Sequence, residues 1–216
     1  YDKSNRRVVL EIGGKMKLQR ILIFIAVFFV SLLYGCASVK VMRTDINKKV
    51  DLSGSWNDTD SRLVAEEMIK DALAQKWLNN FKLDHNKQPV VIVGTILNRT
   101  SEHIDAQLFV SDLEKSLINS DKVKFVASKD ARQEVREEKV DQAEYALKST
   151  AKPQRMERGA DFILQGSINS VKDEIQGKYV IMYQVNLELI NITTNEKAWI
   201  GQKEIKKVVS RRAFGL

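Results

Sequence analysis

The chain has 216 residues, which is enough for one domain of ordinary size together with an export signal. Its 44% hydrophobic content and two prolines are typical of a globular protein and exclude a disordered one. The formal net charge of +7 would suit a nucleic-acid-binding protein, but residues 1–36 hold six basic and two acidic residues, which leaves only +3 on the remainder. No basic, aromatic-rich motif remains there, so we expect no nucleic-acid partner.

An export signal begins at Met16. Lys17 and Arg20 give it a positively charged start, and an apolar run follows from Ile21 to Leu33. This run has 13 residues, whereas a helix that spans a membrane needs about 20. The alternative of a transmembrane anchor with a cytoplasmic arm is therefore disfavoured, and we predict a signal peptide over residues 16–35.

Residues 1–15 precede this signal and are expected to be upstream sequence translated by error. Tyr1 is not a natural start residue, whereas Met16 is. The codons for Gly13-Gly14-Lys15 can also contain a ribosome-binding sequence just upstream of Met16.

Leu33-Tyr34-Gly35-Cys36 closes the apolar run and resembles the bacterial lipobox, with an aliphatic residue at −3 and a small residue at −1. The resemblance implies cleavage before Cys36 and a lipid on its thiol. Ala37 and Ser38 follow instead of the Asp that retains lipoproteins in the inner membrane of enteric bacteria, so we expect the periplasmic face of the outer membrane. The alternative is a buried free cysteine. Because Cys36 is the only cysteine, an internal disulfide and a thiolate metal cluster are excluded.

The mature chain is expected to consist of a lipidated N-terminus and short tether (36–50), a globular domain (51–210) and a tail (211–216). The tether can reach at most about 50 Å when fully stretched. If it is flexible, its average span is about 20 Å.

The first helix of the domain is predicted to begin at Asn57 or Asp58, since either side chain can cap free N–H groups. Apolar residues then recur at a spacing of four, which places them on one buried face. These residues are Val64, Ala65, Met68, Ile69, Ala72 and Leu73, and their rows continue through Trp77 and Phe81. Because Trp77 is in register with this face, we expect it in the core rather than at a ligand-binding surface.

A continuous β-branched run over residues 89–96 predicts a central strand that is covered on both faces. A polar loop over residues 97–102 leads to a second helix, with Asp105 as its N-cap and Ile104 packed against Phe109 across the first turn. The buried face of this helix is expected to hold Leu108, Phe109, Leu113 and Leu117.

A short strand over residues 123–127 precedes a third helix, which Ser128 caps and which reaches Lys148. This helix is rich in charged residues and has few apolar positions, so we expect it to be solvated on most sides. Pro153 suits the first turn of a further brief helix, and Gly159 suits its end.

Three strands are predicted in the last third of the chain, over residues 161–171, 178–190 and 197–208. In the second of them, apolar residues alternate with polar ones, which predicts a sheet with one dry and one wet face. The apolar residues are Tyr183, Val185, Leu187 and Leu189. The predicted fold class is α+β, with helices on one side of a small sheet whose C-terminal strands form an antiparallel meander.

No arrangement in the sequence points to catalysis. His85 and His103 are the only histidines and lack metal-ligand spacing, and the glycines match neither a dinucleotide-binding nor a phosphate-binding motif. The pairs Glu66-Glu67 and Glu137-Glu138 are helix neighbours and diverge, whereas a glycan-cleaving site needs two carboxyl groups that face one cleft. Chance convergence of two carboxylates in the fold stays open. We expect a protein that is not an enzyme and that holds no cofactor or metal.

Several motifs, in order along the domain, resemble the LpoB-type lipoproteins of the bacterial outer membrane. They are DLSGSWNDTDSR (51–62), Val93-Gly94 followed by Asn98-Arg99-Thr100, Gly159 to Phe162 with Leu164 and Gly166, and Trp199-Ile200-Gly201. The resemblance implies a small α/β sandwich similar to the N-terminal domain of TolB. It also implies a non-catalytic role, in which the protein binds and activates a bifunctional penicillin-binding protein and so stimulates peptidoglycan synthesis.

The tether differs from that of the best-known LpoB-type proteins, which carry a long Pro-rich segment. Residues 36–50 are few and include no proline, so direct contact with a synthase of the inner membrane is harder to make. This difference favours an alternative function, that of a structural or secretion-associated lipoprotein that binds other outer-membrane components. The resemblance favours the activator.

The polar loop from Asn98 to His103 is the predicted partner-binding site, through Asn98, Arg99, Thr100 and His103. A strand and a helix hold it on either side, and loops placed in this way are common binding surfaces. Arg99 offers a planar set of donors that interfaces favour. In the alternative interpretation, Asn98 and Thr100 only satisfy local backbone groups and cap the following turn.

Overall fold

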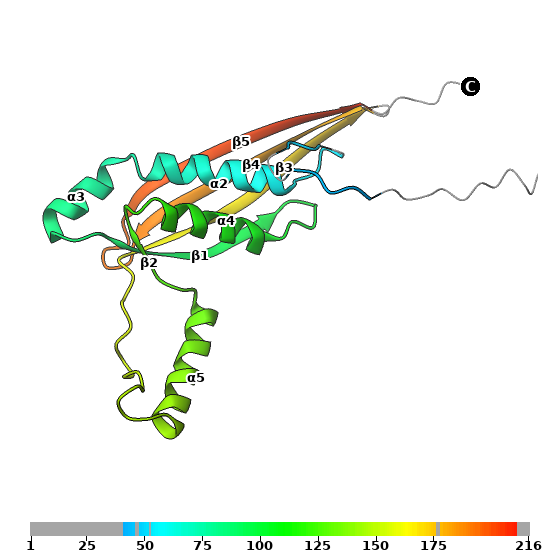
Figure 1. The fold of residues 1–216 in the computed structure, drawn as a ribbon. Helices are drawn as coiled ribbons and strands as arrows, with labels where there is room; N and C mark the ends of the chain where they lie inside the picture. The colour runs from blue at the N-terminus through cyan, green and yellow to red at the C-terminus, as the bar shows by residue number, and fades with distance from the viewer. Residues whose placement is uncertain (1–40, 46–47, 52, 176–177, 211–216) are drawn as a thin grey trace, which may run out of the picture. The chain divides into compact units, whose positions relative to one another are not determined.

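A computed structural model of the chain describes residues 41–45, 48–51, 53–175 and 178–210. The chain divides into two units, residues 1–45 and 46–216, and every described helix and strand belongs to the second (Figure 1). The predicted signal peptide, Cys36 and the tail lie outside the described residues.

Five strands form one mixed sheet in the order β2-β1-β3-β4-β5. β1 (Val90–Arg99) is parallel both to β2 (Lys124–Phe125) and to β3 (Phe162–Ile175). β3, β4 (Lys178–Asn191) and β5 (Lys197–Ser210) form an antiparallel meander. The sheet confirms the predicted α+β fold class, and the predicted meander is present with longer strands than expected.

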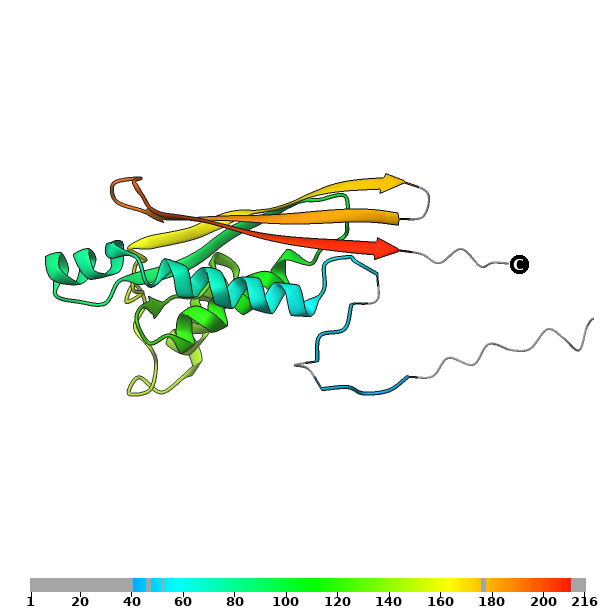
Figure 2. The ribbon, with the colours of Figure 1, turned by 90° about the horizontal axis from the view of Figure 1, so that it is seen from above.

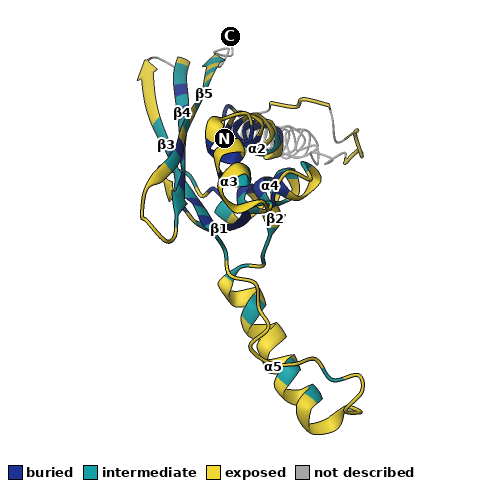
Figure 3. Ribbon diagram, turned by 90° about the vertical axis from the view of Figure 1, so that its left-hand side faces the viewer, coloured by how far each residue is buried: buried dark blue, intermediate teal, exposed yellow. Residues whose placement is uncertain are grey.

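The described part of the second unit has four helices, α2 (Asp58–Ala72), α3 (Lys76–His85), α4 (Ala106–Asn119) and α5 (Lys129–Tyr145). α2 and α4 pack against each other on one face of the sheet, α2 over β5 and α4 over β1 (Figures 2 and 3). The hydrophobic core fills the space between these helices and the inner face of the sheet. Its most deeply buried side chains are Val64, Ala65, Val91, Phe109, Leu113, Leu164, Ile168, Tyr183, Val185 and Leu187.

α2 begins where the sequence indicated. Asn57 is its N-cap, and a capping box joins Asn57 to Asp60 in both directions. The apolar rows stay buried through Trp77 and Phe81, but the expectation that they belong to one helix is wrong, because α2 ends at Ala72 and α3 starts at Lys76. The indole Nε1 of Trp77 donates to the carbonyl of Ala72 at 2.7 Å, which closes the last turn of α2 and fixes the bend.

β1 and α4 follow the predicted pattern with one exception. The first four residues of β1 are buried on both faces, as expected for a covered strand, and the strand continues to Arg99. Asp105 caps α4 by accepting a hydrogen bond from the backbone N–H of Gln107 at 2.9 Å. Phe109, Leu113 and Leu117 are buried, but Leu108 is about half exposed, so its predicted place in the core is wrong. Leu108 lies just outside the narrow stripe that faces the sheet.

α5 and the segment after it stand outside the core (Figure 3). Ser128 caps α5 as predicted, and none of the helix residues is buried, which confirms a solvated helix. The predicted brief helix from Pro153 to Gly159 is wrong, since residues 151–160 form only a turn. Two hydrogen bonds of 2.8 Å from Arg136 to Glu157 hold this segment against α5 instead.

Candidate functional site

The polar loop from Asn98 to His103 is the predicted partner-binding site, and we call it the docking loop. Its shape is set by Asn98, the penultimate residue of β1. Its Nδ2 donates to the carbonyls of Glu102 and Ile104, at 2.8 and 3.4 Å, and its Oδ1 accepts from the backbone N–H of Thr100 at 2.9 Å. The Thr100 hydroxyl in turn accepts from the N–H of Glu102 at 3.1 Å. Asn98 and Thr100 therefore satisfy local backbone groups, as the alternative interpretation of the sequence held. These hydrogen bonds fix the loop, and the partner-binding role of Asn98 and Thr100 stays a prediction.

Glu102, in the middle of this loop, joins it to the rest of the molecule. Its two carboxylate oxygens accept from the N–H of Trp56 at 3.2 Å and from the Tyr183 hydroxyl at 2.6 Å. Burial and the hydrogen bond to Glu102 raise the pKa of Tyr183 above its usual range, so the phenol stays protonated and donates. Sequence reasoning did not single out Glu102, because both of its partners are far away along the chain.

Residues 51–57, which we call the strap, connect the tether to α2; Leu52 lies outside the described residues. Lys207 of β5 holds the strap and the first turn of α2 with three hydrogen bonds from its ammonium. They go to Asp60 at 2.6 Å, to Asp51 at 2.8 Å and to the carbonyl of Ser55 at 3.1 Å. The side chains of Lys207 and Asp60 are only 11% and 10% exposed, so this ion pair is largely shielded from water.

The contacts between Lys207 and the carboxylates of Asp51 and Asp60 shift the pKa values of Lys207 and Asp51. Burial alone would lower the pKa of Lys207, but its hydrogen bonds to Asp51 and Asp60 outweigh that effect and raise it. The hydrogen bond from Lys207 lowers the pKa of Asp51. Both groups are therefore charged throughout the neutral range.

Aromatic packing and one glycine complete the strap. Trp56 makes edge-on contacts with Phe109 and Tyr183, at ring-centroid distances of 6.1 and 5.5 Å. Gly54 adopts a φ of +71°, and a Cβ atom there would clash with Val209. Position 54 therefore requires glycine for both its backbone conformation and its close approach to β5.

Arg99 differs from its neighbours in the loop because it points to the outer face of the sheet. It lines a shallow hollow of about 360 Å³ together with Gln165, Asn186 and Glu188. Glu188 is already engaged by Gln165 at 2.9 Å and by Lys197 at 2.6 Å, and these contacts lower its pKa. Arg99 makes no ion pair with any residue in the described part of the chain, and His103 is exposed on the same loop.

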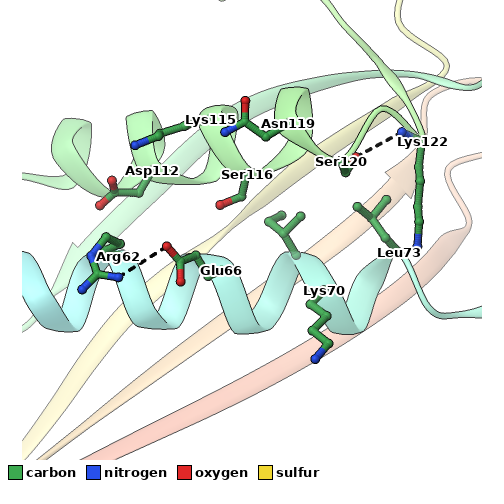
Figure 4. Close-up of a pocket in the computed structure, with 11 residues that line it drawn as sticks. Arg62, Glu66, Lys70, Leu73, Asp112, Lys115, Ser116, Asn119, Ser120 and Lys122 are labelled. Atoms are coloured by element: carbon green, nitrogen blue, oxygen red, sulfur yellow. Dashed lines mark hydrogen bonds and ion pairs between the residues drawn. The ribbon is translucent and has the colours of Figure 1, made fainter. Parts of the chain in front are cut away.

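A second hollow, of about 420 Å³, lies between α2 and α4 (Figure 4). Arg62 and Glu66 of α2 form an ion pair of 3.5 Å, and Asp112 and Ser116 of α4 face them, while Lys70 points away. The residues that line it include neither histidine nor cysteine. Among the described residues, no group of three or more His, Cys, Asp or Glu side chains could hold a metal ion. None of the described helices is both long and apolar enough to cross a membrane.

Comparison with known proteins shows the family. A family model described as "Peptidoglycan-synthase activator LpoB" matches residues 60–205, more than half of the chain. The chain belongs to the LpoB family. This finding confirms the resemblance that the sequence motifs indicated.

Solved structures similar to this LpoB family member include the C-terminal domain of LpoB from Escherichia coli. That match has 17% identity and a TM-score of 0.43, and it covers 68% of this chain and 99% of that one. Lipoprotein GNA1162 from Neisseria meningitidis matches at 10% identity with a TM-score of 0.38, covering 58% and 88%. A PelC dodecamer from Paraburkholderia phytofirmans matches at 15% identity with a TM-score of 0.31, covering 58% and 75%. No curated protein sequence matches the chain.

The motifs that resemble the LpoB family have structural roles in this chain. The strap is the first of them. Asp161, in the Gly159 to Phe162 motif, exchanges two hydrogen bonds of 2.8 Å with the backbone of Val90 and so joins β3 to β1. Trp199 donates to Asp71 at 2.8 Å, and its ring lies where a side chain at Gly201 would be. These contacts give the motifs structural roles, and Arg99 is exposed within the second of them.

Proposed function

We propose that this LpoB family member is a non-catalytic lipoprotein that binds and activates a bifunctional penicillin-binding protein. The observation that carries the proposal is the family match over residues 60–205, which takes in most of the sheet and of α2, all of α4 and the docking loop. A lipid on Cys36 would anchor the protein to the periplasmic face of the outer membrane, and the lipobox at Leu33 to Cys36 supports this part of the proposal.

Within the docking loop, Arg99 and His103 are the groups proposed to contact the synthase. Both are exposed, and the hydrogen bonds of Asn98 and Thr100 hold the backbone that carries them. A rigid loop loses little conformational entropy when a partner binds, so its exposed side chains can contribute fully to affinity. Arg99 brings a guanidinium that no described carboxylate occupies, which suits it to a carboxylate or a backbone carbonyl of the partner.

The test uses the purified mature protein and a purified bifunctional penicillin-binding protein from the same bacterium. The mature protein should raise the rate of glycan polymerisation and should release no product by itself. The double substitution Arg99→Ala, His103→Ala should weaken binding by about 1–2 kcal/mol, the loss expected for hot-spot residues, without a change in melting temperature. Arg155→Ala, at an exposed arginine beside α5, is the matched control and should leave binding unchanged.

Two other outcomes have definite meanings. Wild-type affinity in the double variant would place the docking face elsewhere, for example on α5. A mature protein that neither binds nor stimulates the synthase would contradict the activator function. The short tether without proline would then favour a structural or secretion-associated lipoprotein, and co-purification after crosslinking in cells would identify its outer-membrane partners.

A further inference from the structure

The outer face of the meander carries an exposed apolar patch at the end where β3 and β5 finish and β4 begins. We call it the distal patch; its members are Val171, Ile175, Val180, Met182 and Val208. Val171 pairs with Met182, and Val180 pairs with Val208, so the side chains are direct neighbours across the strands. Val171, Ile175 and Val208 are 66%, 72% and 71% exposed.

No helix of the described part covers this face, since α2 and α4 lie on the opposite one (Figure 2). A single exposed apolar side chain needs no explanation, but a contiguous exposed group marks a contact surface. In the cross-strand row that precedes Val171 the side chains on this face are polar, namely Asn169, Gln184 and Glu204. The side chains therefore change from polar in this row to aliphatic at Val171 and Met182 in the next row. This change indicates that the end of the meander contacts a different environment.

The tether enters the domain at this same end. Asp51, Ser53 and Gly54 of the strap line one groove together with residues 206–210 of β5. The tether upstream of the strap can reach at most about 50 Å, so a lipid on Cys36 would keep this end of the domain, and the distal patch with it, near the membrane surface. A linker this short holds the domain near the surface at an effective concentration on the order of millimolar, so weak intrinsic affinity suffices for docking.

The charged residues around the distal patch also favour contact with a membrane surface. Lys178 and Lys206 are exposed at the rim of the distal patch, next to Asp173. The tether adds four basic residues and one acidic one, namely Lys40, Arg43, Lys48, Lys49 and Asp45. Basic residues beside an apolar patch are attracted to membranes that contain anionic lipids.

We propose that the distal patch docks on the surface of the bilayer that holds the lipid of Cys36. The inference rests on the lipid anchor in the proposed function and adds a second, reversible contact with the membrane. Docking would also affect binding of the synthase, because the proposed partner site lies near the distal patch. Arg99 pairs with Asn169, which precedes Val171 on the same face of β3. A docked domain therefore keeps its proposed partner site close to the lipid, and partner binding competes with docking.

The experiment uses the mature lipoprotein reconstituted into vesicles of phosphatidylethanolamine and phosphatidylglycerol that contain a doxyl-labelled quencher lipid. A fluorophore is attached at Lys206→Cys, beside the patch. The control label is at Ile200→Cys, which lies on the same face of β5, is 65% exposed, and is about 20 Å away along the strand. Lipid quenching is expected at position 206 and not at position 200.

The patch itself is tested by Val171→Thr, Ile175→Thr and Val208→Thr together, in the protein labelled at position 206. Threonine keeps the β-branched shape, so the fold and the melting temperature should be retained. The ratio of docked to undocked molecules should fall at least about tenfold, since three aliphatic groups lose their gain from leaving water. Ile200→Thr in the same background is the matched control and should leave quenching unchanged.

The measurements distinguish a wrong lipid anchor from a wrong docking surface. If Cys36→Ala stays with the membrane fraction as well as the wild type, the lipid anchor is wrong and the docking proposal falls with it. If Cys36→Ala is released but quenching at position 206 equals that at position 200, or survives the triple substitution, only docking is overturned. Fluorophore self-quenching that grows with protein density, without quenching by lipid, would instead show that the patch pairs two copies of the chain.

Discussion

Lys207 shows how one side chain can secure the junction between the tether and the domain. Its ammonium contacts Asp51, the carbonyl of Ser55 and Asp60, so it ties the start and the middle of the strap to the first turn of α2. Lys203, four residues before Lys207 on the same face of β5, instead makes a single exposed ion pair with Glu67 at 2.6 Å. The two lysines therefore form a natural pair for comparison.

Lys207→Met should lower the free energy of unfolding by about 2–3 kcal/mol, because it leaves the shielded carboxylate of Asp60 without its cation. Lys203→Met should cost less than about 1 kcal/mol, as is usual for exposed ion pairs. Denaturant unfolding of the wild type and both variants at neutral pH measures the difference. Equal losses in the two variants would show that the Lys207 contacts do not secure the strap.

The same comparison has a pH dependence. The pKa of Lys207 is raised from 10.5 and that of Tyr183 from 10.0, so their stabilising contributions are complete below these values and are lost as the pH rises above them. The pKa of Asp51 is lowered from 3.8, so its contribution is complete above that value and is lost as the pH falls below it. Wild-type stability should therefore fall above about pH 10 more steeply than that of Lys207→Met.

Among the helices, α4 and α5 contribute to the molecule in opposite ways. α4 buries Phe109, Leu113 and Leu117 against the sheet, whereas α5 buries none of its residues. α5 is instead stabilised by its Ser128 cap and by Arg136, whose paired hydrogen bonds to Glu157 tie it to the following segment.

Substitutions in these two helices should reflect the difference. Leu113→Ala should destabilise the domain by about 3 kcal/mol, since it removes a fully buried side chain and leaves a cavity. Val135→Ala and Val140→Ala, at exposed positions of α5, should each change stability by less than about 0.5 kcal/mol. Thermal and denaturant unfolding measure both. A large loss from either valine would mean that α5 packs against the domain.

Elements were predictable from the sequence where their signals are local. The caps Asn57, Asp105 and Ser128 each bond to a backbone group two or three residues away, and alternation along β4 needs only that strand. The bend between α2 and α3 was missed because it depends on the indole of Trp77 reaching back to Ala72. No propensity of the residues between them signals that contact.

The site was less predictable for the same physical reason. Glu102 bonds to residues 46 and 81 positions away, and Lys207 bonds to carboxylates 147 and 156 positions away. Such contacts exist only after the sheet has formed, and neither residue type nor spacing reveals them in a single sequence. Arg99 could be singled out because its exposure and its chemistry are both readable from a polar loop after an apolar strand.

At the scale of the whole molecule, the strap, which follows the tether in the chain, and the distal patch lie at the same end of the meander. With the proposed lipid anchor in the outer membrane, contact requires that a synthase in the inner membrane reach this end of the domain, or that the tether let the domain move away from the outer membrane. Residues 36–50 span at most about 50 Å. The length of the tether, rather than the affinity of the docking loop, is expected to limit contact in cells.

Lengthening the tether tests this limit. Insertion of a Pro-rich segment of about 20 residues between Lys49 and Val50 adds about 60 Å of stiff reach and leaves the strap intact. In cells, the variant should crosslink to the synthase more efficiently and should raise peptidoglycan synthesis. In detergent, where reach is irrelevant, both proteins should bind and stimulate the purified synthase equally. The same segment added after Leu216 is the control and should change neither measurement. An unchanged signal in cells from the lengthened tether would contradict outer-membrane placement opposite an inner-membrane partner, because two proteins anchored in one membrane need no added reach.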